Sequence, residues 1–249
     1  MKSFFIQVYE ISVFSLKFFK ELFIPPYEVG EFAGNLENFG SRSFPLVSVI
    51  GLLMGLILSL QTKPTLARFG AESFLPAMVA ISVVRELGPV ITALVVAGRV
   101  SSGIGAEIGS MKVTEQVDAL EVSSVDPYRF LVVPRVLAGI VALPLLTAYA
   151  DLLAVIGAFA IMYISGGMGW ELFMTSTVTS LSIADVVPGI AKTFFFGFII
   201  SMIGCYFGFK AEGGTASVGK AATSAVVYSS FLILITDFVL VKVGILIFE

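Results

Sequence analysis

The chain has 249 residues, of which 57% are hydrophobic and 13% charged, with a formal net charge of −3 and a mean hydropathy of +0.99. Soluble domains carry about 45–50% apolar and about 25% charged residues, so this composition excludes an ordinary soluble domain. Only helices and closed barrels satisfy their backbone hydrogen bonds in lipid. The apolar segments are long and continuous, which favours an all-α polytopic membrane protein over a barrel.

Missing residue types also limit the chemistry. The chain has no histidine, which removes the commonest general base and the commonest metal ligand. Its single cysteine, Cys205, lies within an apolar run and is interpreted as a packing residue. We therefore predict no catalytic site, no metal site and no cofactor in this chain. The negative net charge argues against a nucleic-acid partner.

Residues 1–24 predict an amphipathic helix that lies in the membrane interface. Its polar side holds Ser3, Gln7, Glu10, Lys17 and Glu21, and its apolar side holds Phe4, Val8, Ile11, Phe18 and Leu22. A signal peptide is the rival interpretation, but charged residues interrupt the apolar core and no cleavage site follows. Pro25 and Pro26 end the helix, and the next residues are polar and glycine-rich. Residues 1–42 are therefore expected to form an interfacial helix and a connector, and a second short interfacial helix is the alternative for residues 27–42.

Five apolar stretches follow that are long enough to span a membrane as helices. They cover residues 43–62, 73–98, 136–164, 186–209 and 221–248. Residues 43–249 are therefore expected to form a five-helix transmembrane domain. With a cytoplasmic N-terminus, ten lysines and arginines lie on the cytoplasmic side and three at the outer side. The positive-inside rule then places the N-terminus in the cytoplasm and the C-terminus outside.

The longest polar stretch, residues 99–135, falls on the cytoplasmic side of this topology. A short amphipathic helix is predicted there, at about residues 111–123, because Val113, Val117 and Leu120 follow i, i+4, i+7 spacing. Its apolar stripe either packs on the chain's own bundle or docks into a groove on a partner. The spacing alone leaves both interpretations open.

Six short motifs lie between residues 83 and 139. They are RELGP at 85–89, AGR at 97–99, AEIG at 106–109, TEQ at 114–116, DAL at 118–120 and VDP at 125–127. In this order and spacing the segment closely resembles the MlaE family, the permeases of mammalian-cell-entry (MCE) lipid-transport systems. The resemblance extends from about residue 45 to the C-terminus.

The resemblance implies a homodimeric permease of an ABC transporter in the bacterial inner membrane, with phospholipid as its cargo. It implies that the cytoplasmic helix is a coupling helix on a dimeric ATPase, and that this partner holds the ATP and Mg²⁺. The implied coupling residues are Glu115, Gln116, Val117, Asp118, Ala119 and Leu120. A periplasmic oligomer of MCE-domain, MlaD-like subunits is implied above the membrane.

One segment imitates a phosphate-binding loop. Residues 214–221 read GTASVGKA, in which Ala221 replaces the hydroxyl residue that ends the pattern G-x-x-x-x-G-K-[ST]. No strand is predicted before it, and a spanning helix follows. ATP binding by this chain is therefore not expected, and Gly213, Gly214 and Lys220 are interpreted as a cytoplasmic turn with a positive anchor.

Charged residues within the spanning segments cost about 2.5–3.5 kcal/mol each on insertion scales, so each requires a partner or a function. Arg85 and Glu86 are adjacent in the sequence, so they point in different directions on a helix and cannot neutralise each other. They either form interhelix pairs or line a path for a lipid headgroup. Lys192 and Asp237 lie at compatible depths and are predicted to form an ion pair, for which Asp151 competes.

The outer ends of the first two spans hold a second set of candidate lipid contacts. Leu58, Gln61, Leu66 and Phe69 recur at near-helical spacing around Pro64. In the family that the chain resembles, this outer region faces the dimer axis where lipid sits. Plain bundle packing is the alternative interpretation of the same spacing.

Two other functions are kept as alternatives. The buried charges favour an ion-coupled secondary transporter, but no inverted repeat is found. A membrane-embedded lipid-modifying enzyme is the second alternative. Against it stand the missing histidine and the lack of clustered cytoplasmic carboxylates with metal-ligand spacing.

Overall fold

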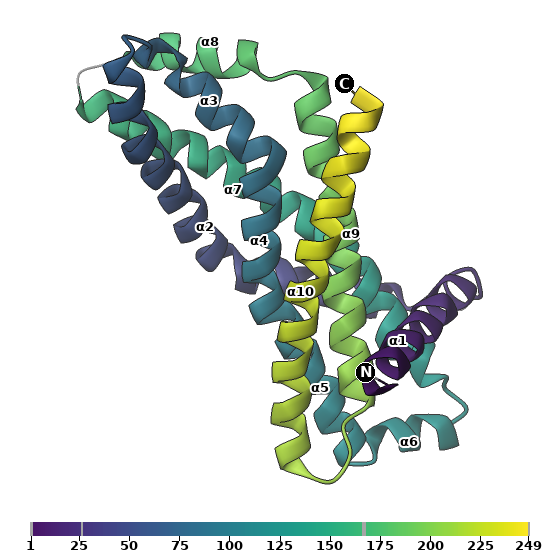
Figure 1. The fold of residues 1–249 in the computed structure, drawn as a ribbon. Helices are drawn as coiled ribbons and strands as arrows, with labels where there is room; N and C mark the ends of the chain where they lie inside the picture. The colour runs from purple at the N-terminus through teal and green to yellow at the C-terminus, as the bar shows by residue number, and fades with distance from the viewer. Residues whose placement is uncertain (1, 26, 166–167, 249) are drawn as a thin grey trace.

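The computed structural model describes residues 2–25, 27–165 and 168–248, and this part of the chain contains helices and no strand (Figure 1). The elements are α1 (Lys2–Glu21), α2 (Val29–Arg68), η1 (Glu72–Phe74), α3 (Leu75–Ser82), η2 (Val83–Leu87), α4 (Gly88–Val96), η3 (Ala97–Ser101), α5 (Ser102–Val113), α6 (Gln116–Val122), η4 (Tyr128–Val132), α7 (Val133–Ile164), α8 (Trp170–Ser180), α9 (Ile183–Phe209) and α10 (Thr215–Phe248). The turns η2, η3 and η4 are π-helical, and η1 is a 3₁₀ turn. The all-α prediction is confirmed.

Five helical runs are long and apolar enough to cross a membrane. They are Val29–Arg68, Glu72–Val113, Tyr128–Ile164, Ile183–Phe209 and Thr215–Gly244. Each contains one of the predicted spans or most of it, in the predicted order. Figure 1 shows α9 and α10 running side by side along the molecule, with α8 near one end of this pair and α5 and α6 near the other. The chain is a multi-pass membrane protein.

The predicted connector before the first span is wrong. The helix α2 begins at Val29 and continues without a break to Arg68, so the expected boundary after residue 42 falls inside it. The polar residues that suggested a connector are Glu31, Asn35, Asn38 and Arg42. They are spaced four, three and four residues apart, so they share one face of the helix. These four residues form a polar face of α2 and not a connecting loop.

The second span also continues further than predicted, through α5 to Val113. Ile104 and Ile108 of α5 are buried and lie against Gly204 and Gly208 of α9. Small residues at such contacts let helices approach closely in a membrane. The first part of the polar stretch at residues 99–135 therefore belongs to the bundle, and the cytoplasmic helix is the shorter α6.

The helix α8 was not predicted. It has 11 residues, too few to cross a bilayer, and its Phe173 packs against Met54 and Ala158 in a core cluster. Figure 1 shows it beside the end of α3, far from α6. Gly167, in the preceding loop that the topology places outside, lies outside the described residues.

The segment that imitates a phosphate loop follows a helix, α9, and itself lies largely on the first turns of α10. Gly213 and Gly214 form the connecting turn with φ values of 89° and 96°. Glycine adopts this left-handed region at no steric cost. The interpretation as a tight turn agrees with this geometry.

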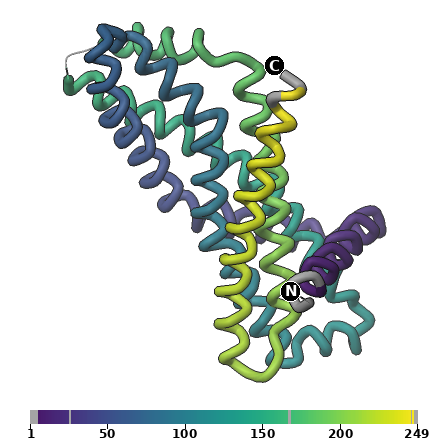
Figure 2. Tube along the Cα trace, viewed as in Figure 1, coloured from purple at the N-terminus to yellow at the C-terminus, as the bar shows by residue number. Residues whose placement is uncertain are grey.

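The helix α1 packs on the bundle by its polar residues as well as its apolar ones. Figure 2 shows it running obliquely to the long axes of α9 and α10. Phe18 of the predicted apolar side is buried in the core. However, Gln7 of the polar side accepts a hydrogen bond from the Tyr228 hydroxyl at 2.7 Å. The exposed large apolar side chains of α1 are Ile6, Val8, Tyr9, Val13, Leu16 and Phe19.

Backbone contact at glycine holds α2 against α7. Gly51 and Gly55 of α2 lie on the backbone of Ala150 and Ala154, and Gly157 of α7 lies on the backbone of Leu52. A Cβ at Gly51 would come within 2.7 Å of the Ala150 carbonyl oxygen. Only glycine permits this spacing, so the contact cannot relax around a larger side chain.

Replacing Gly55 with alanine should therefore destabilise the protein, because the new methyl group overlaps the Ala154 carbonyl. Overpacking of this kind costs about 1–3 kcal/mol. Thermal unfolding of the purified protein in detergent measures the effect. The matched control is Gly40→Ala on the same helix, where an added Cβ meets nothing within 4 Å. Equal melting temperatures for the two variants would contradict this account of the interface.

Candidate functional site

A π-helical turn lies near the middle of the second span. At this turn the Gly88 N–H bonds to the Val83 carbonyl, one residue further back than in an α-helix. Pro89 follows and has no N–H to donate to the carbonyl of Arg85, four residues before it. The ammonium group of Lys192, on α9, lies 3.4 Å from that carbonyl oxygen and donates to it. A side chain from another helix thus replaces the missing backbone donor.

Lys192 also forms ion pairs with two carboxylates. Its Nζ lies 2.7 Å from Glu86 Oε2 and 3.0 Å from Asp237 Oδ1 on α10. The lysine side chain is only 4% exposed, so both contacts are made largely away from solvent. The structure therefore brings together the predicted pair of Lys192 and Asp237 and adds Glu86, one of the two lipid-path candidates at this level. Three spans meet at this one cation.

Arg85 turns to a different partner. Its guanidinium lies 3.7 Å from Asp185 at the first turn of α9, and its side chain is 34% exposed. Asp185 also accepts hydrogen bonds from the Ser182 backbone and hydroxyl, which form the N-terminal cap of α9. The neighbours Arg85 and Glu86 thus contact opposite charges on α9 at two levels, as their different directions on the helix require.

Asp151 does not join Lys192. Its carboxylate lies against Gly88, at the position that a Cβ of residue 88 would occupy. Its buried Oδ1 has no hydrogen-bond partner among the described residues. On α7, Asp151 therefore packs beside the π-turn that holds Glu86, and Gly88 is the residue that leaves room for it.

An apolar pocket of about 340 Å³ lies between α2 and the same π-turn. It is lined by Ile50, Leu53, Met54, Ile57, Leu58 and Gln61 of α2, and by Leu87 and Ile91. Leu87 follows Glu86 directly, so one turn contributes to both the charge cluster and the pocket. Such a pocket suits a hydrocarbon chain, with Gln61 as its polar group.

Two of the four lipid contacts predicted at the outer ends, Leu58 and Gln61, line this pocket. The other two are placed elsewhere. Leu66 packs against the core cluster around Met54 and Leu75. Phe69 is 80% exposed at the end of α2. Arg85 and Glu86 are not among the lining residues either. The rotation of α2 about its axis decides which of the four residues reach the pocket. Residue spacing alone does not specify that rotation.

The apolar stripe of α6 faces the chain's own bundle. Val117 is 2% exposed and belongs to the main core cluster, and Leu120 packs against that cluster. Of the two interpretations of this stripe, the contacts favour packing on the chain's own bundle: Val117 is buried there and Leu120 is partly buried. Their role in coupling to an ATPase stays a prediction. The exposed side chains of the segment are Glu115, Gln116, Asp118, Ala119, Glu121 and, at 88% exposure, Val122.

The corner between α5 and α6 sets this orientation. Glu115 adopts a left-handed conformation with φ of 59°, which turns the chain sharply between the two helices. Lys112 of α5 forms an ion pair with Asp118 of α6 at 2.6 Å. Together they hold α6 with its apolar side inward and its acidic side outward.

The helix α1 is fastened to the C-terminal end of α9. Glu10 accepts hydrogen bonds from Tyr206, in the last turn of α9, and from Lys210, directly after that helix. These two bonds lower the pKa of Glu10 below its ordinary value of 4.5. The hydrogen bond that Lys210 donates to Glu10 in turn raises the pKa of Lys210 above its ordinary value of 10.5. Both groups therefore stay charged, and the link persists, throughout the neutral pH range.

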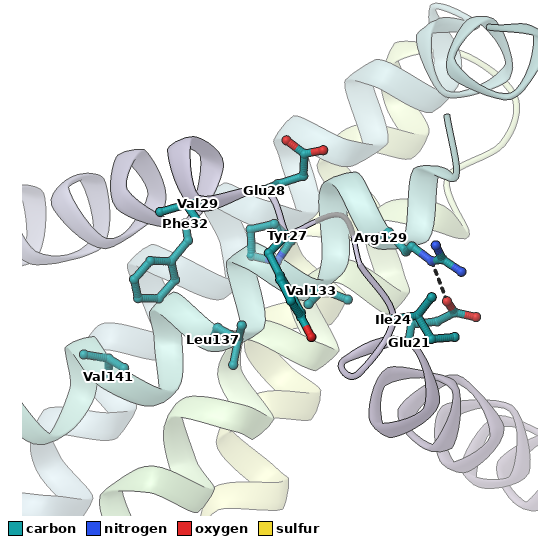
Figure 3. Close-up of a pocket in the computed structure, with 11 residues that line it drawn as sticks. Glu21, Ile24, Tyr27, Glu28, Val29, Phe32, Arg129, Val133, Leu137 and Val141 are labelled. Atoms are coloured by element: carbon teal, nitrogen blue, oxygen red, sulfur yellow. Dashed lines mark hydrogen bonds and ion pairs between the residues drawn. The ribbon is translucent and has the colours of Figure 1, made fainter. Parts of the chain in front are cut away.

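A cavity of about 280 Å³ lies where the end of α1, the start of α2 and α7 meet (Figure 3). Figure 3 shows Phe32, Leu137 and Val141 toward one end of it and the pair of Arg129 and Glu21 at the other. That ion pair measures 2.7 Å. Arg129 belongs to η4, which follows α6 in the chain. The ion pair thus ties α1 to the segment that leaves α6.

Comparison with known proteins gives matches over most of the chain. A family model described as Permease MlaE matches residues 32–243, from α2 into α10. A probable ABC transporter permease protein of Rickettsia typhi is 40% identical over 231 residues, which cover 93% of this chain and 89% of that protein. The intermembrane phospholipid transport system permease protein MlaE of Haemophilus influenzae is 34% identical over 208 residues, 82% and 78% of the two chains. The chloroplastic protein TRIGALACTOSYLDIACYLGLYCEROL 1 of Arabidopsis thaliana is 37% identical over 205 residues, 82% and 59% of the two chains.

Removing the cation of the charge cluster tests its structural part. Lys192→Met should leave Glu86 and Asp237 without their partner and cost on the order of 3–5 kcal/mol, the usual loss when one member of a buried pair is removed. Adding Glu86→Gln and Asp237→Asn should restore much of that stability. Unfolding in detergent measures all variants, with Lys220→Met at an exposed position as the control. A Lys192→Met protein as stable as this control would show that the cluster does not hold the bundle together.

Proposed function

This chain belongs to the MlaE permease family of ABC transporters, and on that premise we propose that it moves phospholipid between the inner membrane and a periplasmic MCE-domain carrier. A separate cytoplasmic ATPase dimer supplies the energy, and two copies of this chain form the permease. The observation that carries the proposal is the apolar pocket on α2 that shares the turn Val83–Leu87 with the charge cluster. The name of the Haemophilus influenzae relative supports phospholipid as the cargo.

In the proposed transport path, Leu58, Gln61 and Leu87 contact an acyl chain. Arg85 is the nearby cation that a lipid phosphate can reach, because its side chain is 34% exposed whereas that of Lys192 is 4% exposed. Asp185 holds the guanidinium when no phosphate is present. Glu86 has the structural role of holding Lys192. The chain itself catalyses no reaction on the lipid.

Coupling to the ATPase is assigned to the outward side of α6. Its exposed residues Glu115, Gln116, Asp118, Ala119 and Val122 offer an acidic surface with a small apolar centre. A displacement of α6 would reach the second span through Lys112 and α5. It would reach α1 through η4 and the pair of Arg129 and Glu21.

The proposed orientation places the N-terminus in the cytoplasm, and cysteine labelling tests it. Cys205 is buried and can be replaced with alanine to give a cysteine-free background. A cysteine at Glu212, beside the glycine turn, should react only from the cytoplasmic side. A cysteine at the exposed Gly169 should react with a membrane-impermeant maleimide from outside. The reverse pattern at both positions would overturn the orientation and put α6 on the wrong side of the membrane.

Reconstitution tests the transport function and the coupling surface together. Permease, the ATPase that co-purifies with it and the carrier are placed in liposomes, and transfer of labelled phospholipid is followed with and without ATP. Val122→Glu should weaken ATPase binding about tenfold or more, since it charges the centre of the interface, and should abolish ATP-dependent transfer. Val178→Glu on α8, also exposed, is the control and should change neither.

Two results would count against this function. Normal ATPase binding and transfer by Val122→Glu would remove α6 from the coupling interface. Transfer driven by an ion gradient without ATPase would favour an ion-coupled secondary transporter. Leu120→Glu is a less specific test, because Leu120 is partly buried against the core cluster and a charge there disturbs packing as well as any interface.

A further inference from the structure

A second, polar cavity of about 600 Å³ lies between the first part of α2, the second span and α7. The polar face of α2, with Glu31, Asn35, Asn38 and Arg42, forms one wall. Arg99 and Glu107 belong to the facing wall, and Arg135 reaches in from α7. Neither the apolar pocket nor the charge cluster shares a residue with this cavity.

The cavity has uncompensated positive charge. Arg135 is 3% exposed; it binds Glu107 at 2.7 Å and the Leu131 carbonyl at 2.9 Å. That pairing uses the carboxylate of the facing wall. Arg42 and Arg99 are exposed and form no ion pair among the described residues. Two guanidinium groups on different helices therefore line the same space without an ion-pair partner, and with Arg135 they outnumber the two lining carboxylates, Glu31 and Glu107.

The depth of these two arginines matches the inner membrane surface. Arg42 lies 26 residues before the end of α2, and Arg99 lies 27 residues after the start of the second span. At about 1.5 Å per residue, both are roughly 40 Å along their helices from the outer ends. A bilayer with its headgroups is about 40–45 Å thick. The cavity therefore lies at the level of the cytoplasmic headgroups.

Glycines keep the cavity open. Gly30, Gly34 and Gly103 line it, and a Cβ added at any of them would meet no atom within 4 Å. The space is thus available for a ligand and is also easy to fill by substitution. Asn35 and Asn38 add amide groups that can bond to phosphate or glycerol oxygens.

We propose that this cavity binds the phosphate and headgroup of an anionic phospholipid from the cytoplasmic leaflet, with Arg42 and Arg99 as the two cationic contacts. Arginine suits phosphate because its planar group donates two parallel hydrogen bonds. The permease then has a lipid-binding site at the inner membrane surface, in addition to the apolar pocket nearer the outer ends of its helices. This inference rests on the proposed lipid-transport function for its meaning but concerns binding alone.

The test is a binding measurement that needs no ATPase. The full-length permease is placed in nanodiscs of phosphatidylcholine with a minor share of phosphatidylglycerol, and the lipids that it retains are counted by native mass spectrometry. Wild type should retain phosphatidylglycerol in excess of its share. Arg42→Gln with Arg99→Gln should lose that excess at least fivefold, and the two Arg→Lys changes should keep part of it, because charge remains but the paired hydrogen bonds do not.

Two controls make the result specific. Lys63→Gln with Arg68→Gln removes the same charge near the outer end of α2 and should leave the excess unchanged. Gly103→Leu fills the cavity without altering charge and should reduce phosphatidylglycerol retention. Equal loss in the outer-end control, or full retention by the Arg42 and Arg99 variant, would overturn the proposal.

Excess inorganic phosphate distinguishes a lipid site from a site for a free anion. If phosphate displaces the retained phosphatidylglycerol completely, the cavity is a free-anion site and the lipid assignment is wrong. Retention that persists in phosphate supports it. Arginine-dependent retention in a permease that fails to transfer lipid would contradict the transport function while leaving this site intact. Transfer without such retention would do the reverse.

Discussion

Pro89 has no N–H, and at the centre of the permease a lysine from another helix takes the place of that missing donor. The Arg85 carbonyl loses its helical partner, and Lys192 of α9 donates to it instead. Because the same ammonium group meets Glu86 and Asp237, one side chain joins the second, fourth and fifth spans. Charge in the membrane interior is tolerated only when it is paired, so the lysine and its two carboxylates depend on one another. The helices that carry them are held in one relative position by this requirement.

Close backbone contacts at glycine residues also hold these helices together. Gly189 of α9 lies against the Val84 carbonyl, and Gly88 leaves room for Asp151 of α7. The π-turn is therefore enclosed by glycine contacts on two sides and by Lys192. On α2, Gly51 and Gly55 let α7 approach at backbone distance. A hydrocarbon-lined pocket can persist beside so much buried charge because these contacts are rigid.

The end of the bundle that carries α1 and α6 is held in part by ion pairs and hydrogen bonds at its surface. The helix α6 turns its apolar stripe inward and is linked to α5 by one ion pair, and α1 is held by Glu10, Gln7 and Glu21. Ion pairs at such exposed positions contribute little each, about 0–1 kcal/mol. A partner that moves α6 therefore works against weak ion pairs at the surface and against the packing of Val117 in the core. The polar cavity around Arg42 and Arg99 lies between the first part of α2, the second span and α7.

The sequence by itself determined the fold class, the number and order of the spans and the family, because a spanning helix satisfies its own backbone and is therefore a local property of the chain. Depth along two helices was also enough to pair Lys192 with Asp237. Only the tertiary structure decided that Val117 and Leu120 face inward, that Glu86 joins Lys192 while Asp151 does not, and that Leu58 and Gln61 reach the pocket while Leu66 and Phe69 do not. It also decided that the polar residues at 31–42 form a helix face that lines a cavity. These outcomes depend on the rotation of each helix about its axis, and that rotation is set by the neighbours it packs against, which spacing within one segment does not record.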